Sequence, residues 1–167
     1  MSDASEIKRL TALFRKLGAP DPEGWARSQV EEGIPQLARF LFLRQAWRGV
    51  VSENDPTWID RAIAHAEEDS DAPYAGAGYA LSSLRARGAT DFELTELVRA
   101  MQAELLFHIA YILGDSSDLE PLADEIRWAL VQTDEDDQPI AVVDGLHESV
   151  LETDPTGREA RPRRSEG

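Results

Sequence analysis

The sequence of 167 residues contains no cysteine. This absence excludes a disulfide scaffold, a thiolate nucleophile and any zinc site built on sulfur. Long apolar runs are also missing, because the longest candidate, Leu105–Gly114, covers about half of the roughly 20 residues that a membrane-spanning helix needs and contains a histidine. The first residues include Asp3 and Glu6, and no apolar stretch follows them, which is unlike a secretory signal. We therefore expect a soluble, cytoplasmic protein.

Basic residues are scarce: 17 Lys and Arg stand against 32 Asp and Glu, which gives a formal net charge of -15. The imbalance is greatest between Asp115 and Asp154, where 13 acids accompany a single base, Arg127. Such a negative field repels phosphates and anionic lipid head groups. The charge therefore disfavours nucleic-acid and membrane-surface binding and favours a cationic protein partner. Acidity that only maintains solubility is an equal alternative.

Motifs for catalysis or cofactor binding are missing too. The sequence has no G-x-S-x-G elbow, and the glycines around Gly76 lack the third glycine of the dinucleotide fingerprint. One pair stands out, because Glu104 and His108 lie one turn apart in a helical stretch and so share a face. With carboxylates from another helix they could bind a divalent metal, but a hydrogen bond between the two is the preferred interpretation. We expect a non-enzymatic chain without a cofactor.

Apolar residues recur at helical spacing through most of the chain. Helix starts are predicted at Asp21 and Asp55, each followed by proline, and at Thr90, which forms a capping box with Glu93. After residue 126 the period changes to two short apolar runs, "RWALVQT" and "PIAVV", joined by five polar residues, which predicts a β-hairpin. The helix after Thr90 is the most strongly marked, and its apolar stripe consists of Leu94, Leu97, Val98, Met101, Leu105, Ile109 and Ile112.

The predicted fold is therefore mainly α, a helical bundle of about five to seven helices with a small C-terminal β-hairpin. We expect residues 1–126 to form a helical domain. Residues 127–151 should form the hairpin and a short segment packed on that domain. Residues 152–167 have almost no apolar content and should form a flexible tail.

Four consecutive acids, Asp134 to Asp137, fill the turn of the predicted hairpin. Aspartate suits turns because its side chain bonds to nearby backbone groups, but one or two would suffice, so a negative recognition patch is slightly favoured over a merely solvated loop. Trp47, Trp58 and Trp128 are expected in the core, whereas Trp25 lies on the least apolar helix, where an exposed tryptophan would be typical of a binding hot spot. The predicted partner-binding residues are Asp118, Glu120, Asp124, Glu125, Asp134, Glu135, Asp136, Asp137 and Trp25.

In these respects the chain resembles the immunity proteins of bacterial toxin systems, which are small, acidic and helical and cover a cationic surface of a toxin or effector. The resemblance lies in composition and architecture along most of the chain and carries over no individual residue. It implies a non-catalytic antitoxin-type protein that neutralises a basic partner. Two alternatives stay open. One is a self-associating adaptor, a homo-oligomer joined through the hairpin edge or the small-residue helix near Gly76 and Gly78; the other is a metal-dependent helical-bundle enzyme that uses Glu104 and His108.

Overall fold

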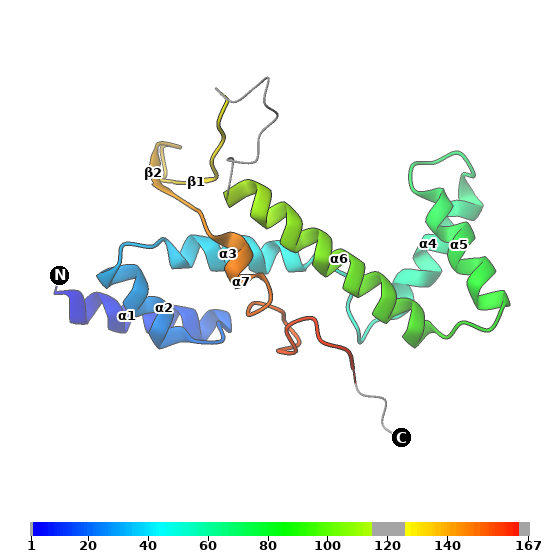
Figure 1. The fold of residues 1–167 in the computed structure, drawn as a ribbon, viewed down its shortest axis with the longest axis horizontal. Coiled ribbons are helices and arrows are strands. Elements are labelled where there is room, and N and C mark those ends of the chain that lie inside the picture. Colours follow the sequence, from blue (N-terminus) through cyan, green and yellow to red (C-terminus); the bar gives the residue numbers. More distant parts are fainter. Residues whose placement is uncertain (1, 115–125, 164–167) are drawn as a thin grey trace. The chain divides into compact units, whose positions relative to one another are not determined.

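The computed structural model describes residues 2–114 and 126–163. In these ranges the chain forms seven helices and one two-stranded antiparallel sheet (Figure 1). The predicted mainly helical fold with a C-terminal β-hairpin is confirmed. The elements are α1 (Asp3–Leu17), α2 (Pro22–Glu31), α3 (Gln36–Trp47), α4 (Thr57–Glu68), α5 (Ala75–Ala86), α6 (Asp91–Gly114), β1 (Val131–Thr133), β2 (Pro139–Val142) and α7 (Leu146–Val150).

The chain divides into two compact units. The first comprises Met1–Arg48 and Leu105–Arg161, and the second comprises Gly49–Glu104 and Pro162–Gly167. These boundaries differ from the predicted division at residues 126 and 151. They differ because one boundary falls inside α6 and because the segment after the hairpin packs on the N-terminal helix α3.

Three aromatic rings form the centre of the first unit. Phe14 of α1, Trp25 of α2 and Phe40 of α3 meet edge to face, with ring centroids 5.4–6.1 Å apart. The chain can turn back from α1 to α2 because Gly18 adopts a left-handed conformation, with φ of 80°, at the end of α1. The predicted cap at the start of α2 is confirmed, since the Asp21 carboxylate accepts a hydrogen bond from the backbone N–H of Gly24 at 3.0 Å.

Two buried side chains of α3 hold α7 in place. The Arg39 guanidinium donates to the carbonyl oxygen of Gly145 at 2.5 Å and to the hydroxyl of Ser149 at 3.2 Å. Two turns further along α3, the Trp47 indole N–H donates to the carbonyl oxygen of Val150 at 3.0 Å. A charged group and an indole are costly to bury without partners, so these bonds fix the segment that follows the hairpin against α3.

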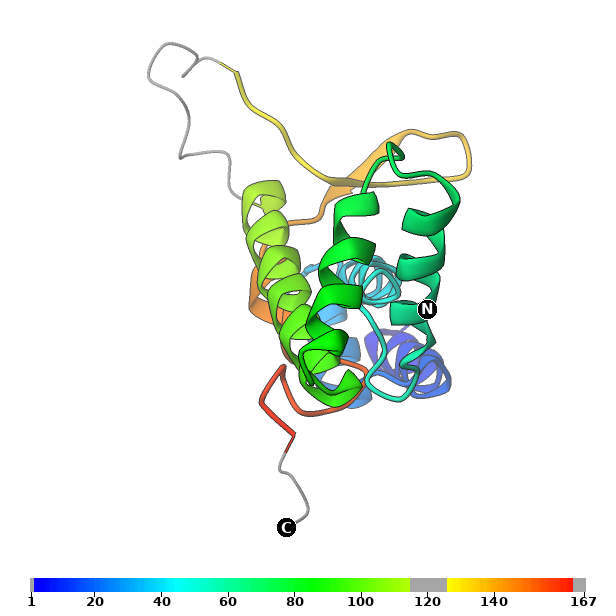
Figure 2. The same ribbon diagram turned by 90° about the vertical axis from the view of Figure 1, so that its right-hand side faces the viewer.

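The second unit contains the helical pair α4 and α5, which lie side by side in Figures 1 and 2. Gly78 allows this close approach, because a Cβ placed there would lie 2.2 Å from the carbonyl oxygen of Ala62 on α4. Arg85 joins the pair to the start of α6 through ion pairs with Asp60 at 2.6 Å and with Asp91 at 2.7 Å. Gly78, one of the small residues of α5, thus serves packing against α4.

Helix α6 begins at the predicted capping box: the Thr90 N–H donates to the Glu93 carboxylate at 2.8 Å, and the Glu93 N–H donates to the Thr90 hydroxyl at 3.2 Å. The face that this helix buries differs from the one that its apolar stripe indicated. Leu94 of the stripe is buried, but Leu97, Met101 and Leu105 are 55%, 61% and 56% exposed, and Ile109 and Ile112 are exposed as well. The buried positions are instead Thr95, Arg99, Ala103, Leu106 and Ala110.

Hydrogen bonds explain why polar residues lie on the buried side of α6. The Arg99 guanidinium donates to the carbonyl oxygen of Val51 at 2.9 Å, and the Gln102 side chain accepts from the Val51 N–H at 2.8 Å. The Trp58 indole N–H donates to the Thr95 hydroxyl at 3.1 Å. These side chains provide hydrogen-bond partners for the backbone of Val51 and for the Trp58 indole. Apolar side chains could not provide such partners.

By length and composition alone, α6 is the one helix in the described ranges that could cross a membrane. The candidate judged from the sequence was shorter because it began at Leu105, whereas the helix begins at Asp91. Only 17% of the most apolar 18-residue stretch of α6 is buried, so this stretch is not a core helix.

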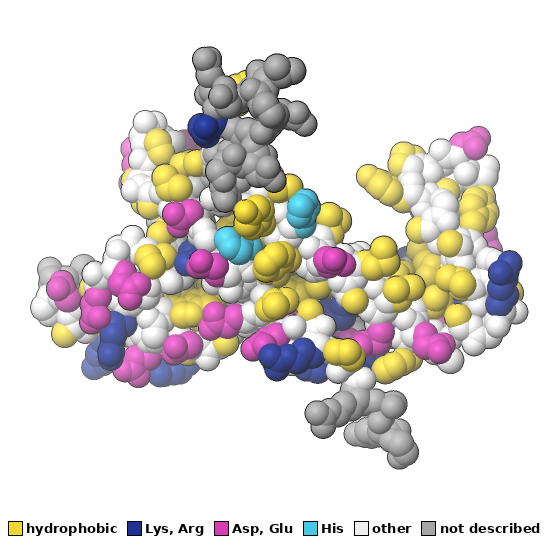
Figure 3. All heavy atoms as spheres, in the orientation of Figure 1, with side chains coloured by type: hydrophobic (Ala, Val, Ile, Leu, Met, Phe, Trp, Pro, Cys, Tyr) yellow, Lys and Arg dark blue, Asp and Glu magenta, His cyan; other side chains and the backbone are white. Residues whose placement is uncertain are grey.

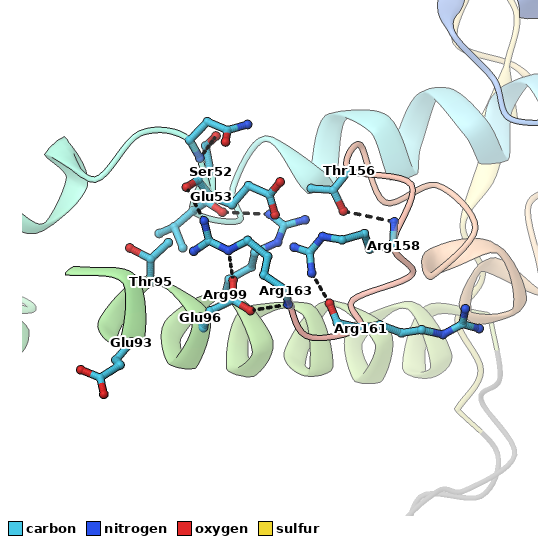
Figure 4. Close-up of polar contacts among 12 residues, drawn as sticks. Ser52, Glu53, Glu93, Thr95, Glu96, Arg99, Thr156, Arg158, Arg161 and Arg163 are labelled. Carbon is cyan, nitrogen blue, oxygen red and sulfur yellow. Dashed lines mark hydrogen bonds and ion pairs between the residues drawn. The ribbon is translucent and has the colours of Figure 1, made fainter. Parts of the chain in front are cut away.

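The segment 152–163 forms hydrogen-bonded turns where the sequence indicated a flexible tail. The buried Asp154 carboxylate accepts from the Thr156 N–H at 3.0 Å and from the Ala160 N–H at 2.9 Å. In the second unit, Arg163 donates to the Glu96 carboxylate of α6 at 2.7 Å and to the carbonyl oxygen of Glu53 at 3.2 Å (Figure 4). Aspartate turn chemistry and an Arg–Glu pair thus organise a segment that has few apolar residues.

Candidate protein-binding surface

The hairpin formed by β1 and β2 belongs to the first unit and is mostly exposed. Val131 lies opposite Val142, and both side chains are exposed, as is Ile140. Val143, the residue after β2, is 2% exposed and anchors the base of the hairpin. Its N–H donates to the carbonyl oxygen of Leu130 at 2.8 Å. A two-stranded hairpin with exposed apolar side chains is marginal in water, and such exposed apolar surface is typical of an interaction element.

The acidic loop, which we define as residues 134–137, connects the two strands. Its first residue makes the turn: the Asp134 carboxylate accepts from the N–H groups of Asp136 and Gln138, both at 2.9 Å, and the Asp134 N–H donates to the Gln138 carbonyl oxygen at 3.0 Å. Asp137 adopts a left-handed conformation, with φ of 59°, which aspartate tolerates better than most residues. Asp134 and Asp137 therefore have conformational reasons to be aspartates.

The side chains of Glu135 and Asp136 do not shape the turn. Both are exposed, and within residues 2–114 and 126–163 neither carboxylate takes part in an ion pair or a side-chain hydrogen bond. Their charges are therefore directed to solvent and not neutralised by the described part of the chain. The remaining acids predicted to bind a partner, Asp118, Glu120, Asp124 and Glu125, lie outside the described residues.

The prediction that Trp25 is exposed is wrong. Its side chain is 8% exposed and fills the aromatic core between Phe14 and Phe40, so it is a core residue and not an exposed tryptophan. Helix α2 is polar overall because only one narrow face is buried, and Trp25 lies on that face. Trp128, which the sequence placed in the core, is 43% exposed, and its indole N–H donates to the carbonyl oxygen of Ile112 at 2.7 Å.

Glu104 and His108 share one exposed face of α6, as their spacing predicts. The expected hydrogen bond between them is not among the contacts of the described residues. These residues also include no group of three or more carboxylate or imidazole side chains that could hold a metal ion. The pair therefore remains two exposed polar side chains surrounded by apolar neighbours.

An aromatic cluster lies beside this pair and was not predicted. The rings of Phe107 and Tyr111 lie edge-on to the His147 imidazole of α7, with centroids 5.9 and 5.1 Å apart. Figure 3 shows that hydrophobic side chains gather along α6 on the face drawn, with acidic and histidine side chains among them. The helical period of α6 reveals its apolar stripe, but not which face of the helix packs.

Comparisons with protein families, with curated proteins and with solved structures found no match to this chain.

Proposed function

We propose that this chain is a non-catalytic protein-binding module that engages a cationic protein partner through the acidic loop and the apolar strands beside it, in the manner of an immunity or antitoxin-type protein. One observation carries the proposal: Glu135 and Asp136 project unneutralised charge from the tip of a hairpin whose Val131, Ile140 and Val142 side chains are exposed. Negative charge beside apolar surface suits a partner whose lysines and arginines surround an apolar patch.

The loop acts mainly on the rate of encounter. Unpaired carboxylates on a protruding tip attract a positively charged surface over a distance of roughly one Debye length, about 8 Å at physiological ionic strength. The exposed valine and isoleucine side chains then contribute apolar contact area at short range. The net charge of -15 adds a weaker attraction that is spread over the whole chain.

The test measures the association rate constant with a basic toxin nuclease encoded beside this chain. The double variant Glu135→Gln/Asp136→Asn removes two charges and leaves Asp134 and Asp137 to shape the turn. We expect its association rate at low salt to fall about three- to tenfold. The matched control Glu67→Gln/Glu68→Gln removes the same charge from exposed positions on α4 and should change the rate much less. Equal effects of both variants, or no binding at low salt, would contradict the proposal.

A further inference from the structure

Helix α6 carries large apolar side chains that stay exposed along most of its length, although the His147 imidazole of α7 contacts two of them, Phe107 and Tyr111. Its large side chains are exposed by 38–61%, and they are Leu97, Met101, Leu105, Phe107, Ile109, Tyr111 and Ile112. Leu97, Met101, Leu105 and Ile112 follow one another at four- and seven-residue steps, so they form one stripe along the helix, with the others on its two sides. Figure 3 shows this concentration of hydrophobic side chains over α6.

The size of this face matches one half of a dimer interface. A large side chain carries roughly 200 Å² of surface, so the exposed fractions leave on the order of 700 Å² on these seven residues and Trp128 together. A typical monomer has no apolar patch larger than about 300–600 Å². A standard interface buries about 800 Å² on each partner. The patch is therefore large for a monomer and sufficient for stable pairing.

The composition of the face favours a second copy of the chain. From residue 97 to residue 112 the only Lys or Arg is Arg99, which is buried on the opposite side of α6, and the only acid is Glu104. Surfaces that are this poor in charge are typical of interfaces between identical subunits, which are more apolar than transient ones. For a cationic partner, in contrast, this face offers only one carboxylate, that of Glu104, as an ion-pair acceptor.

We propose that two copies of the chain pair through this face, with their α6 helices antiparallel about a two-fold axis level with Leu106. In a two-fold interface, any contact from residue i to residue j is repeated from j to i. Pairing Met101 of one copy with Ile112 of the other therefore brings Glu104 close to His108 of the other copy, twice. A parallel arrangement would instead place Glu104 against Glu104.

The spacing of these residues supports the antiparallel register. The midpoint between positions 101 and 112 is within one residue of the midpoint between positions 104 and 108, so a single axis satisfies both pairs. The two polar side chains of an otherwise apolar face then meet one another. A lipid bilayer offers Glu104 no such partner, and burying an unpaired carboxylate is costly.

The first test measures the mass of the whole chain in solution by sedimentation equilibrium. We expect twice the chain mass of 18.5 kDa at micromolar concentration. Leu105→Asp should yield a monomer with an unchanged far-ultraviolet circular dichroism spectrum. The matched control Leu84→Asp alters a leucine on α5 that is 40% exposed and should leave the dimer intact. A wild-type chain that stays monomeric, or that binds phosphatidylcholine vesicles through α6 as a monomer, would overturn the proposal.

The second test is a charge exchange that depends on the register. Glu104→Lys and His108→Glu should each raise the dissociation constant of the dimer about tenfold, because each leaves like or unmatched groups face to face. The double variant Glu104→Lys/His108→Glu places opposite charges across the axis and should bind within about threefold of wild type. Failure of the double variant to recover would overturn the antiparallel pairing. Both tests are independent of the acidic loop, so their failure would not affect the proposed function.

Discussion

The glycines of α5 provide a direct test of how α4 and α5 pack. A Cβ at Gly78 would lie 2.2 Å from the carbonyl oxygen of Ala62 and 2.7 Å from the Cβ of Ala66, whereas a Cβ at Gly76 would meet nothing within 4 Å. We therefore predict that Gly78→Ala destabilises the protein and that Gly76→Ala, two residues earlier in the same helix, stabilises it slightly. The two substitutions are chemically identical, so only the surroundings can give opposite signs.

The expected magnitude follows from two opposing effects. Alanine is favoured over glycine in a helix by about 1 kcal/mol, and by less in the first turn, where Gly76 lies. At Gly78 this gain is outweighed, because α4 and α5 must separate by about 1 Å to accept the methyl group, and overpacking of this kind costs about 1–3 kcal/mol. We expect a net loss of up to about 2 kcal/mol for Gly78→Ala and a gain of up to about 1 kcal/mol for Gly76→Ala.

Urea unfolding followed by far-ultraviolet circular dichroism measures both free energies of unfolding. Sedimentation of the same samples tests whether either glycine belongs to a surface between copies, as the sequence allowed. A Gly78→Ala variant that is as stable as Gly76→Ala, or that alters the mass in solution without altering stability, would refute this packing of α4 and α5.

Two further predictions concern the segment that packs on α3. Trp47→Phe removes the buried hydrogen bond to the Val150 carbonyl oxygen and should lower the free energy of unfolding by about 1–3 kcal/mol in urea, whereas Trp128→Phe, at an exposed indole, should cost less. Partial desolvation raises the pKa of the Glu152 carboxyl, the negative charge of Asp21 acts in the same direction, and a hydrogen bond from the Trp25 indole opposes them. Because the folded pKa is the higher one, the stabilisation from the protonated carboxyl is complete below the unfolded pKa, about 4.3, and is lost as the pH rises through the folded pKa. Glu152→Gln should therefore be more stable than wild type at pH 7 and equal to it in acid, and thermal melts across this range that show the reverse trend would exclude the account.

Local chemistry made much of the fold predictable. The caps at Asp21 and at Thr90 with Glu93 were identified from residue type and spacing, because a cap needs only a side-chain oxygen within three residues of an unpaired N–H. The same holds for the turn at Asp134, whose carboxylate bonds to backbone two and four residues away. The fold class followed from these local signals together with the change of hydrophobic period after residue 126.

The direction in which each helix faces could not be predicted in the same way. Trp25 and Trp128 exchanged their expected environments, because burial depends on which distant segment packs against a face. Helix α6 shows this most clearly. Its sequence contains both the apolar stripe through Met101 and a polar and small-residue stripe through Arg99 and Ala103, and the chain buries the second. The backbone of Val51, which Arg99 and Gln102 bond, and the Trp58 indole, which Thr95 bonds, explain the choice.

The inverted burial of α6 bears on the candidate surfaces as well. A folded chain normally turns the apolar stripe of a helix inward, since burial stabilises by about 25 cal/mol for each Å² of apolar surface removed from water. The described chain forgoes that gain at Leu97, Met101 and Leu105, although it buries a stripe of the same helix that includes Thr95 and Arg99. The gain is recovered if a second copy covers the stripe, so dimerisation and folding stability should be coupled in this protein.

The two proposed surfaces differ in their response to salt, and this difference separates them. Attraction between the acidic loop and a cationic protein weakens as ions screen Glu135 and Asp136, so the association rate should fall steeply with ionic strength. Pairing through Met101, Leu105 and Ile112 rests on apolar burial, which salt does not screen. In one salt series on the wild-type chain, partner binding should therefore be lost while the dimer persists. If partner binding and dimerisation weakened together as the salt concentration rose, the dimer would depend on charge. The apolar face of α6 would then not be the surface that joins the two copies.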